Sequence, residues 1–240
     1  MSNNTSNNGN ARCQQQPKGP KPFDPTMTPT KPYGSPVLGE AYVYLRVNGV
    51  DKFIWHAKSK AKLTTFSSAA AHQLSKYKDA SGQSTRELTC EAGDEVALRR
   101  VLHWIETNDL NSPKQLTMAT LPDEHTTLDV MKVHHAAYTI RIPKEYRHND
   151  VHQAIFDTII PESWFSVEQF IEIHDWCFYD KAVITQMRKK CAWRGIMGYL
   201  TEEEETKVVR YMVDHGIKDE CEEIERKLRA ELKRKGVLQG

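Results

Sequence analysis

The chain has 240 residues, with 33 lysines and arginines against 32 acidic residues, which gives a formal net charge of +1. This length allows one or two domains with a buried core, and the near-zero charge excludes the long-range field of a strongly basic nucleic-acid-binding protein or of an acidic solvating chain. No stretch approaches the roughly 18 consecutive apolar residues that cross a bilayer, so we expect no membrane partner.

The N-terminal segment is polar. Residues 1–38 contain mainly Asn, Ser, Gln, Thr, Lys and Pro, with Phe23 and Tyr33 as the only aromatic residues. Such a segment buries too little apolar area to offset its conformational entropy, so we expect a disordered tail. The first residues lack the pattern of a secretory signal, and the five cysteines show no paired spacing. We therefore expect free thiols and an intracellular protein of the nucleus or cytoplasm.

A tight reversal of the chain follows this segment. The run Ala-Tyr-Val-Tyr-Leu-Arg-Val over residues 41–47 favours a strand. Asn48 and Gly49 supply the positive backbone angles of a two-residue turn, and extended residues resume at 52–57. We therefore predict a β-hairpin over residues 41–57.

Short elements come next. Residues 59–77 carry apolar side chains at spacings of three and four, which predicts one or two short helices. Residues 85–92 have the length of one strand, and Asp94 is placed to cap a helix whose apolar face runs over 96–105. The polar loop 107–127 is longer than compact connections usually are, which indicates an insertion or a functional excursion.

The remainder of the chain is predicted to be helical. The first of these helices must end before Pro143, and Ser166 with the glutamine three residues later has the pattern of a capping box. Thr201 leads four glutamates, which suit the positive start of a helix. The predicted helices are residues 128–140, 148–160, 166–178, 180–200, 201–215 and 219–235.

The order of hairpin, helix pair, single strand and further helices is unusual among small mixed domains. Together with four stretches of sequence, it resembles a BTB/POZ domain, of the short and divergent kind found in filamentous fungi. The resemblance implies an α+β fold, with a small β-sheet and a cluster of helices over residues 39–160 and an α-helical extension over 161–240. The four stretches are residues 47–58, 63–69, 86–109 and 128–143.

Five positions carry this resemblance at residue level. Phe53, His56 and Lys58 match the family's second strand, in which a Phe, an aliphatic residue and His-x-Lys run into the first helix. Leu63 and Phe66 belong to the stretch that is similar to the junction of the first two helices.

Family members dimerise through the first helix and the first strand. The resemblance places Tyr42, Tyr44, Leu63 and Phe66 on that dimer surface. The alternative is that some of these side chains fill the core of a single chain. Exposed apolar patches mark partner surfaces, so a monomer that buries all four argues against the dimer surface.

Some family members also bind a cullin scaffold through a hydrophobic residue two before a Glu. Tyr77 and Asp79 keep that spacing here, but the acid is shorter by a methylene. This moves the charge by more than ~1 Å, which is large against a hydrogen-bond window of about 2.7–3.2 Å. A cullin partner is therefore not favoured.

The C-terminal helices offer two further candidate surfaces. Trp193, Met197 and Tyr211 are residue types that are enriched at interfaces, so these helices are a candidate docking module for a protein partner, with packing onto the core as the favoured alternative. A basic cluster is able to neutralise phosphates of a nucleic acid, although a solvated helix edge is the favoured interpretation. This cluster comprises Arg188, Lys189, Lys190 and Arg194.

Histidine and cysteine spacings give weak signals for a metal. Adjacent His134 and His135 point about 100° apart on a helix, and the pair His148 and His152 lacks the acid of a His-Glu-x-x-His motif. A zinc site across the C-terminal helices competes with plain packing of thiols beside aromatic rings, and packing is favoured. Its residues would be His174, Cys177, Cys191 and Cys221.

The sequence contains no Gly-rich phosphate loop, nucleophile elbow or dinucleotide fingerprint. We therefore predict no catalytic residue, no cofactor and no metal. The predicted function is non-catalytic protein–protein recognition, by homodimerisation, by holding another chain as an adaptor or regulator, or both. The alternative is a nucleic-acid-associated regulator of transcription or chromatin that uses the basic cluster, and a metal-dependent enzyme comes third.

Overall fold

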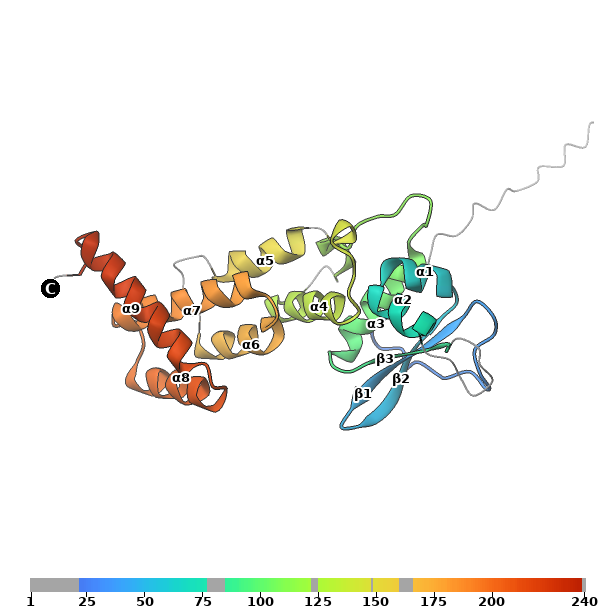
Figure 1. The fold of residues 1–240 in the computed structure, drawn as a ribbon, viewed down its shortest axis with the longest axis horizontal. Coiled ribbons are helices and arrows are strands. Elements are labelled where there is room, and N and C mark those ends of the chain that lie inside the picture. The colour runs from blue at the N-terminus through green and yellow to red at the C-terminus, as the bar shows by residue number, and fades with distance from the viewer. Residues whose placement is uncertain (1–21, 77–84, 122–124, 148, 160–165, 239–240) are drawn as a thin grey trace, which may run out of the picture.

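The computed structural model describes residues 22–76, 85–121, 125–147, 149–159 and 166–238, and these form a mixed α+β structure. Figure 1 shows a small sheet with helices at one end of the molecule and a row of helices that extends from it. None of the described helices combines the length and the apolar character that a membrane crossing needs.

The sheet has three strands in the order β2-β1-β3. Strand β1 (Ala41–Val47) is antiparallel to β2 (Val50–Ala57) and parallel to β3 (Glu87–Cys90). Asn48 and Gly49 have φ values of 52° and 78°, as the predicted tight turn requires. The predicted hairpin and the predicted single strand are therefore confirmed, and they share one sheet.

Helices follow in the predicted order. Asp94 caps α3 by accepting a hydrogen bond from the backbone N–H of Ala97 at 3.0 Å. Thr126 starts α4 with a capping box, which includes Asp129. The helices up to this point are α1 (Lys60–Phe66), α2 (Ser68–Lys76), α3 (Glu95–Thr107) and α4 (Thr127–Thr139).

The C-terminal helices begin where the capping residues predict. Ser166 and Thr201 each form a capping box. Helix α7 (Lys181–Ile196) ends earlier than the predicted residue 200, because Gly198 adopts a φ of 72°. These helices are α5 (Asn149–Ile159), α6 (Val167–Cys177), α7 (Lys181–Ile196), α8 (Glu202–Asp214) and α9 (Lys218–Arg234).

The predicted loop 107–127 contains one short element. A turn of 3-10 helix, η1 (Met118–Thr120), lies within it, and a second turn, η2 (Lys144–Tyr146), follows α4. An isolated parallel bridge joins Leu116 to Arg147. The described part of this loop is therefore tied to the segment after α4.

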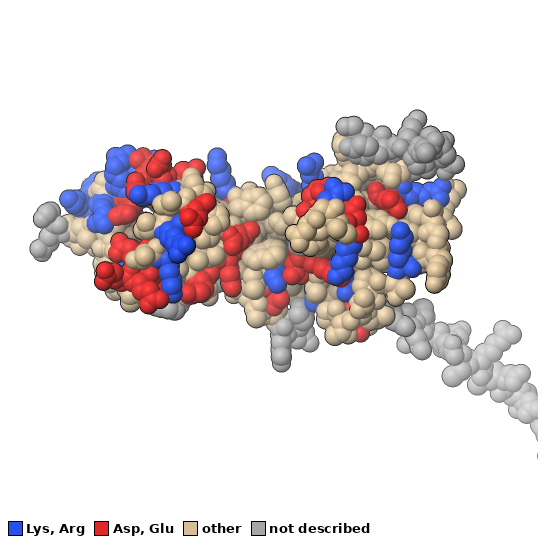
Figure 2. Space-filling model, turned by 90° about the horizontal axis from the view of Figure 1, so that it is seen from below, with Lys and Arg blue, Asp and Glu red and all other residues tan. Residues whose placement is uncertain are grey.

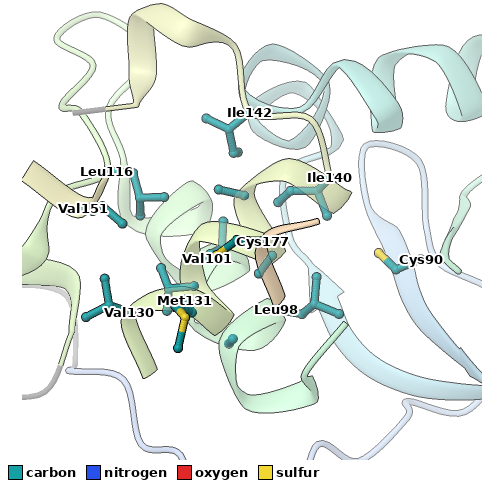
Figure 3. Packing of buried hydrophobic residues seen from close by; sticks show 14 of the residues in the cluster. Cys90, Leu98, Val101, Leu116, Val130, Met131, Ile140, Ile142, Val151 and Cys177 are labelled. Carbon is teal, nitrogen blue, oxygen red and sulfur yellow. The ribbon is translucent and has the colours of Figure 1, made fainter. Parts of the chain in front are cut away.

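One hydrophobic cluster runs through the described residues from the sheet to α8. Figure 3 shows its centre, where Leu98 and Val101 of α3 and Met131 of α4 lie close to Ile140 and to Cys177 of α6. The helix α4 occupies the middle of the molecule in Figure 1 and contacts both α3 and α6. The core thus continues across residue 160, where we predict a domain boundary.

The described part of the N-terminal tail, residues 22–38, makes contacts with the folded part of the chain. Residues 22–38 contain no helix or strand, but the Arg100 guanidinium lies 4.8 Å from the Phe23 ring centroid. The Tyr42 hydroxyl donates a hydrogen bond to the Gly34 carbonyl oxygen at 3.3 Å. The ammonium of Lys31 lies 5.5 Å from the Tyr42 ring centroid. This segment therefore covers part of the sheet and of α3.

Candidate functional site

An open groove of about 730 Å³ lies beside strand β3 in the described part of the chain. Four parts of the fold form it: helix α2, strand β3, the C-terminal end of α4 with the residues that follow it, and Phe178 after α6. We call this cavity the β3 groove. It is the candidate site for a ligand because it joins exposed aromatic side chains, cationic side chains and a strand edge.

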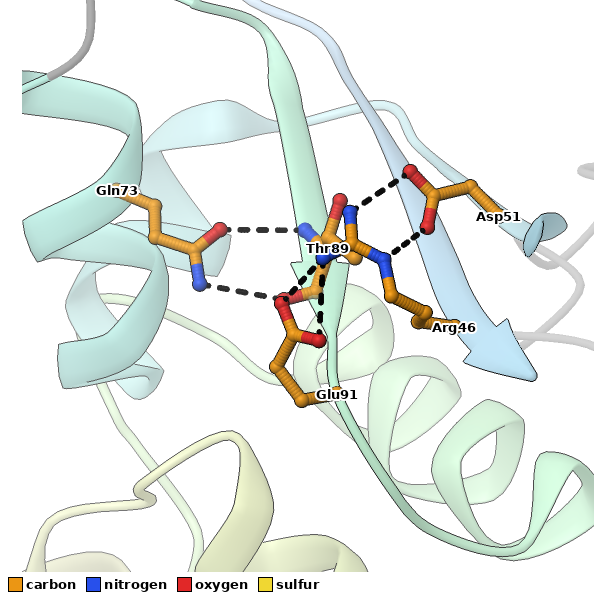
Figure 4. Close-up of polar contacts among 5 residues, drawn as sticks. All are labelled: Arg46, Asp51, Gln73, Thr89 and Glu91. Carbon is orange, nitrogen blue, oxygen red and sulfur yellow. Dashed lines mark hydrogen bonds and ion pairs between the residues drawn. The ribbon is translucent and has the colours of Figure 1, made fainter. Parts of the chain in front are cut away.

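The edge of β3 is closed by a side chain (Figure 4). The Gln73 side-chain amide donates to the Thr89 carbonyl oxygen, and the Thr89 N–H donates to the Gln73 Oε1, each at 3.2 Å. The N–H and the carbonyl group of Thr89 point away from β1. The two hydrogen bonds to Gln73 therefore satisfy the backbone groups that a fourth strand would use. The groove therefore has a polar edge whose hydrogen bonds are already made.

An arginine holds the far end of β3 to the hairpin. The Arg46 guanidinium donates to Asp51 at 2.8 and 3.1 Å and to Glu91 at 3.0 and 3.2 Å (Figure 4). The hydrogen bonds from Arg46 lower the pKa of Asp51. This exposed network fixes the segment after β3, which lines the groove.

Aromatic side chains form one wall of the groove. The rings of Tyr138 and Tyr179 are stacked, with centroids 3.8 Å apart and an interplanar angle of 12°. Phe178 packs edge-on against Tyr179. Tyr138 remains 46% exposed and Phe178 60% exposed, so a rigid apolar surface faces solvent at this wall.

A buried histidine lies behind this wall. His135 lines the groove, is only 6% exposed, and contacts the rings of Trp176 and Phe178. Burial lowers its pKa, which favours the neutral imidazole. Its Nδ1 atom has no hydrogen-bond partner among the described residues. An unpaired buried polar atom is costly, so this position of the wall lowers the stability of the fold.

Two arginines give the groove a positive charge. Arg141 and Arg147 both line it, and neither forms an ion pair with a carboxylate in the described ranges. Arg141 has a φ of 53°, the left-handed conformation in which a non-glycine residue costs roughly 1–2 kcal/mol. The fold therefore keeps an arginine where glycine is the usual residue after a helix.

The predicted dimer surface is not exposed. Tyr42, Tyr44, Leu63 and Phe66 are all buried within the single chain. Phe66 packs against the rings of Trp104 and Tyr146, and the N-terminal segment lies over the two tyrosines, where Lys31 approaches both rings. The expectation that these four residues form a dimer surface is corrected, because they fill the core or lie beneath residues 22–38.

The other family-pattern positions lie together at the hairpin. Phe53 packs edge-on against Tyr42. His56 Nε2 lies 2.8 Å from Glu40 Oε2, and the Lys58 ammonium lies 3.0 Å from His56 Nδ1. The hydrogen bond from His56 lowers the pKa of Glu40. These contacts fix the end of β2.

The predicted docking helices are partly committed to the core. Tyr211 is buried, and its hydroxyl donates to Asp175 and lies 2.8 Å from His174 Nδ1. Trp193 and Met197 are only partly exposed. The Lys190 ammonium lies 5.3 Å from the Trp193 ring centroid. Tyr211 thus supports packing rather than docking, in line with the alternative drawn from the sequence.

The predicted basic cluster does not form one surface. Arg194 is 4% exposed and donates to the Tyr199 carbonyl oxygen at 2.9 Å. Arg188 is paired with Glu220 of α9. Only Lys189 of the four is exposed. Because these side chains have different contacts, the expectation of one basic surface is corrected. Figure 2 shows lysine and arginine side chains interspersed with acidic ones on the visible face.

The candidate cullin contact cannot be placed. Tyr77 and Asp79 lie outside the described residues.

A cluster of histidine and aspartate side chains lies on the other side of α4. His152 Nε2 is 2.9 Å from Asp180 Oδ2, and His134 Nε2 is 3.8 Å from the same oxygen. His134 Nδ1 lies 2.6 Å from the Tyr179 hydroxyl oxygen. Burial lowers the pKa of His134 to about 4. We call His134, His152 and Asp180 the His–Asp cluster.

Sequence spacing missed this cluster, because its members lie on α4, on α5 and at the start of α7. Neither of the two histidine pairs noted in the sequence forms a site by itself. His148 lies outside the described residues, and His134 and His135 face different cavities. In the described ranges, the four residues of the predicted zinc alternative do not converge as metal donors. Those residues are His174, Cys177, Cys191 and Cys221.

The four cysteines in the described part of the chain are free and buried. Burial raises the pKa of Cys90, Cys177 and Cys191 to about 12 in each case. A thiol with a raised pKa is a poor nucleophile, which fits packing rather than covalent chemistry.

The β3 groove and the His–Asp cluster are therefore two places where the described side chains offer chemistry to a ligand. In comparisons with known proteins, no family model, no curated protein and no solved structure matches this chain.

Proposed function

We propose that this chain is a protein-recognition module of the BTB/POZ type, which acts without catalysis by holding a segment of another polypeptide in the β3 groove. The order of elements supports the family assignment: an antiparallel hairpin, two short helices, a strand parallel to β1 and then further helices. This is the order on which the resemblance of the sequence rests.

The exposed aromatic wall carries the proposal. Tyr138 and Phe178 present large apolar surfaces to solvent at an open groove, and both are held in place by Tyr179. Aromatic side chains that are exposed and already ordered lose little conformational entropy on binding. An apolar side chain of a partner is therefore expected to lie against this wall.

The charge of the groove selects the class of partner. Arg141 and Arg147 form no ion pair with the described carboxylates, whereas Glu91 is already paired with Arg46. Charge complementarity then favours an acidic segment. We propose a polypeptide segment that combines acidic residues with an aromatic or aliphatic side chain.

The closed strand edge defines how this segment is held. Because Gln73 occupies both outward backbone groups of Thr89, a partner does not extend the sheet there without displacing that side chain. Side-chain contacts with the aromatic wall and the arginines are therefore the expected mode of binding. Homodimerisation through the four predicted residues is not part of the proposal, since all four are buried.

Selection from a random peptide library on the purified full chain tests this function. We expect the selected peptides to be acidic and to contain aromatic or aliphatic residues. Phe178→Ala and Arg141→Glu should each abolish the enrichment, and Val213→Ala, at an exposed apolar position of α8, should leave it unchanged. Enrichment that is the same for Phe178→Ala and the unmodified chain would overturn the proposal.

A further inference from the structure

We propose that the His–Asp cluster binds one divalent transition-metal ion, with zinc as the preferred ion, in a second site whose cavity shares Arg147 with the β3 groove. The three donor residues come from three elements that pack together: His134 from α4, His152 from α5 and Asp180 from the residue that precedes α7. The fold, and not a local motif, brings them to one place.

The donor atoms have separations that suit one ion. One donor atom from each of the three residues lies within 4.8 Å of the other two, and Asp180 Oδ2 is 3.8 Å from His134 Nε2 and 2.9 Å from His152 Nε2. Tetrahedral zinc with bonds of about 2.0–2.1 Å places its ligand atoms roughly 3.3–3.4 Å apart. The two distances to Asp180 Oδ2 bracket this value, so changes of about half an ångström in these two separations bring the histidine nitrogens to it.

Two of the donors are oriented by other groups. Asp180 Oδ1 accepts hydrogen bonds from the N–H groups of Ala182 and Val183, at 3.1 and 3.2 Å, so the carboxylate is fixed with Oδ2 toward the histidines. His134 Nδ1 is 2.6 Å from the Tyr179 hydroxyl oxygen. When this nitrogen carries the proton and donates to the hydroxyl, Nε2 keeps its lone pair for a metal, which is the usual arrangement around ligating histidines.

A position for a fourth ligand lies beside the cluster. His134, His152 and Asp180 line a cavity of about 410 Å³, together with Lys144, Arg147 and Asn149. Two imidazoles and one carboxylate with an open fourth position are a donor set that zinc accepts readily. A water molecule is the expected fourth ligand.

An ordinary ion pair explains only part of this arrangement. A contact between His152 and Asp180 requires neither the convergence of His134 Nε2 nor the hydrogen bond that orients the His134 ring. The two interpretations differ in one measurable respect. The ion pair predicts no metal affinity that depends on all three residues together.

Isothermal titration of the purified full chain with zinc chloride, after removal of metals, tests the proposal. We expect one equivalent of zinc to bind. His152→Ala and Asp180→Asn should each weaken the affinity at least about tenfold, and Tyr179→Phe, which removes only the orienting hydroxyl, should weaken it by about tenfold. Titration with cobalt(II) should give the visible absorption of a tetrahedral site, and this absorption should be lost in the first two variants.

Matched controls separate loss of metal binding from loss of folding. Asparagine also caps helices, so Asp180→Asn should keep the metal-free melting temperature. His72→Ala removes an exposed histidine of α2 outside the cluster and should leave the zinc affinity unchanged. A full chain that shows no zinc binding, or binding that His152→Ala and Asp180→Asn leave intact, would overturn the proposal. Peptide selection by the β3 groove is unaffected by that result.

Discussion

The side-chain amide of Gln73 pairs with both the N–H and the carbonyl oxygen of Thr89. A residue of helix α2 thereby takes the place that a neighbouring strand would occupy. An open strand edge is a template for unwanted pairing with other chains, and a side chain that satisfies its backbone groups removes that template. The same contact leaves the β3 groove accessible from the side of its aromatic wall.

Gln73→Ala tests the role of this amide. The variant loses two hydrogen bonds, each with a net contribution of about 0.5–1.5 kcal/mol, so we expect the free energy of unfolding to fall by about 1–2 kcal/mol. Urea denaturation measures this change, and light scattering should show more association at high concentration. Gln153→Ala, at an exposed position of α5, is the control: it loses one exposed hydrogen bond to Asp157, so the free energy of unfolding should change by less than ~0.5 kcal/mol and association should stay the same. Equal stability of the two variants would contradict the role assigned to Gln73.

Arg141→Gly separates stability from binding. The left-handed backbone at this position costs an arginine roughly 1–2 kcal/mol, and glycine removes that cost while adding roughly 0.5–1 kcal/mol of conformational entropy to the unfolded chain. We therefore expect the free energy of unfolding to stay the same or to rise slightly, while binding of acidic peptides is lost. A variant that is less stable by more than ~1 kcal/mol would show that the arginine side chain has a structural role.

Phe66→Ala distinguishes a core position from a dimer surface. Phe66 has no exposed surface and packs against Trp104 and Tyr146, so the substitution should lower the free energy of unfolding by about 3–5 kcal/mol. The molecular mass in solution, measured by size exclusion with light scattering, should not change. A stable variant with half the mass of the unmodified chain would instead restore the dimer surface predicted from the sequence.

His174 is expected to make the stability depend on pH. Burial first, and the positive charge of Arg188 next, lower its pKa below the ordinary value of 6.5, against the opposing effects of Asp175 and Glu220. His215 adds to the lowering. Below about pH 6.5 the unfolded chain binds a proton at this histidine that the folded chain does not, so the free energy of unfolding falls as the pH decreases and is constant above that value for this group.

Denaturation of His174→Asn at several pH values isolates this contribution. Asparagine can still donate a hydrogen bond to the Tyr211 hydroxyl but does not titrate. The loss of stability between pH 7 and pH 5 should therefore be smaller in the variant than in the unmodified chain. Identical pH profiles would show that His174 titrates in the folded state as it does in the unfolded state.

Local signals in the sequence were sufficient for much of the fold. The pair Asn48 and Gly49 predicted the turn because only a few residue types tolerate positive φ, and Asp94, Ser166 and Thr201 predicted helix starts because their side chains cap the first free N–H groups. The short turns η1 and η2 were not predicted. A bridge between Leu116 and Arg147 lies beside both turns, and it joins segments that are distant in sequence.

The β3 groove and the His–Asp cluster could not be predicted from residue spacing, because packing between elements distant in the sequence forms them. The β3 groove joins α2, β3, the end of α4 and Phe178, and the His–Asp cluster joins α4, α5 and α7. The four residues of the predicted dimer surface also could not be assigned from the sequence alone. Aromatic and aliphatic residue types occur in both cores and interfaces, so residue type alone does not predict which of the two applies. In the structure, residues 22–38 and Trp104 lie against these side chains and bury them.

A charge-reversal binding experiment tests the recognition function most directly. The dissociation constant of a labelled acidic peptide selected by the full chain would be measured by fluorescence anisotropy for the unmodified chain and for Arg141→Glu, and again for the same peptide with its acidic residues replaced by lysine. We predict that the unmodified chain binds the acidic peptide, that Arg141→Glu loses it, and that the variant binds the lysine peptide more tightly than the unmodified chain does. Equal affinities of both proteins for both peptides would contradict the assignment of the β3 groove as the recognition site.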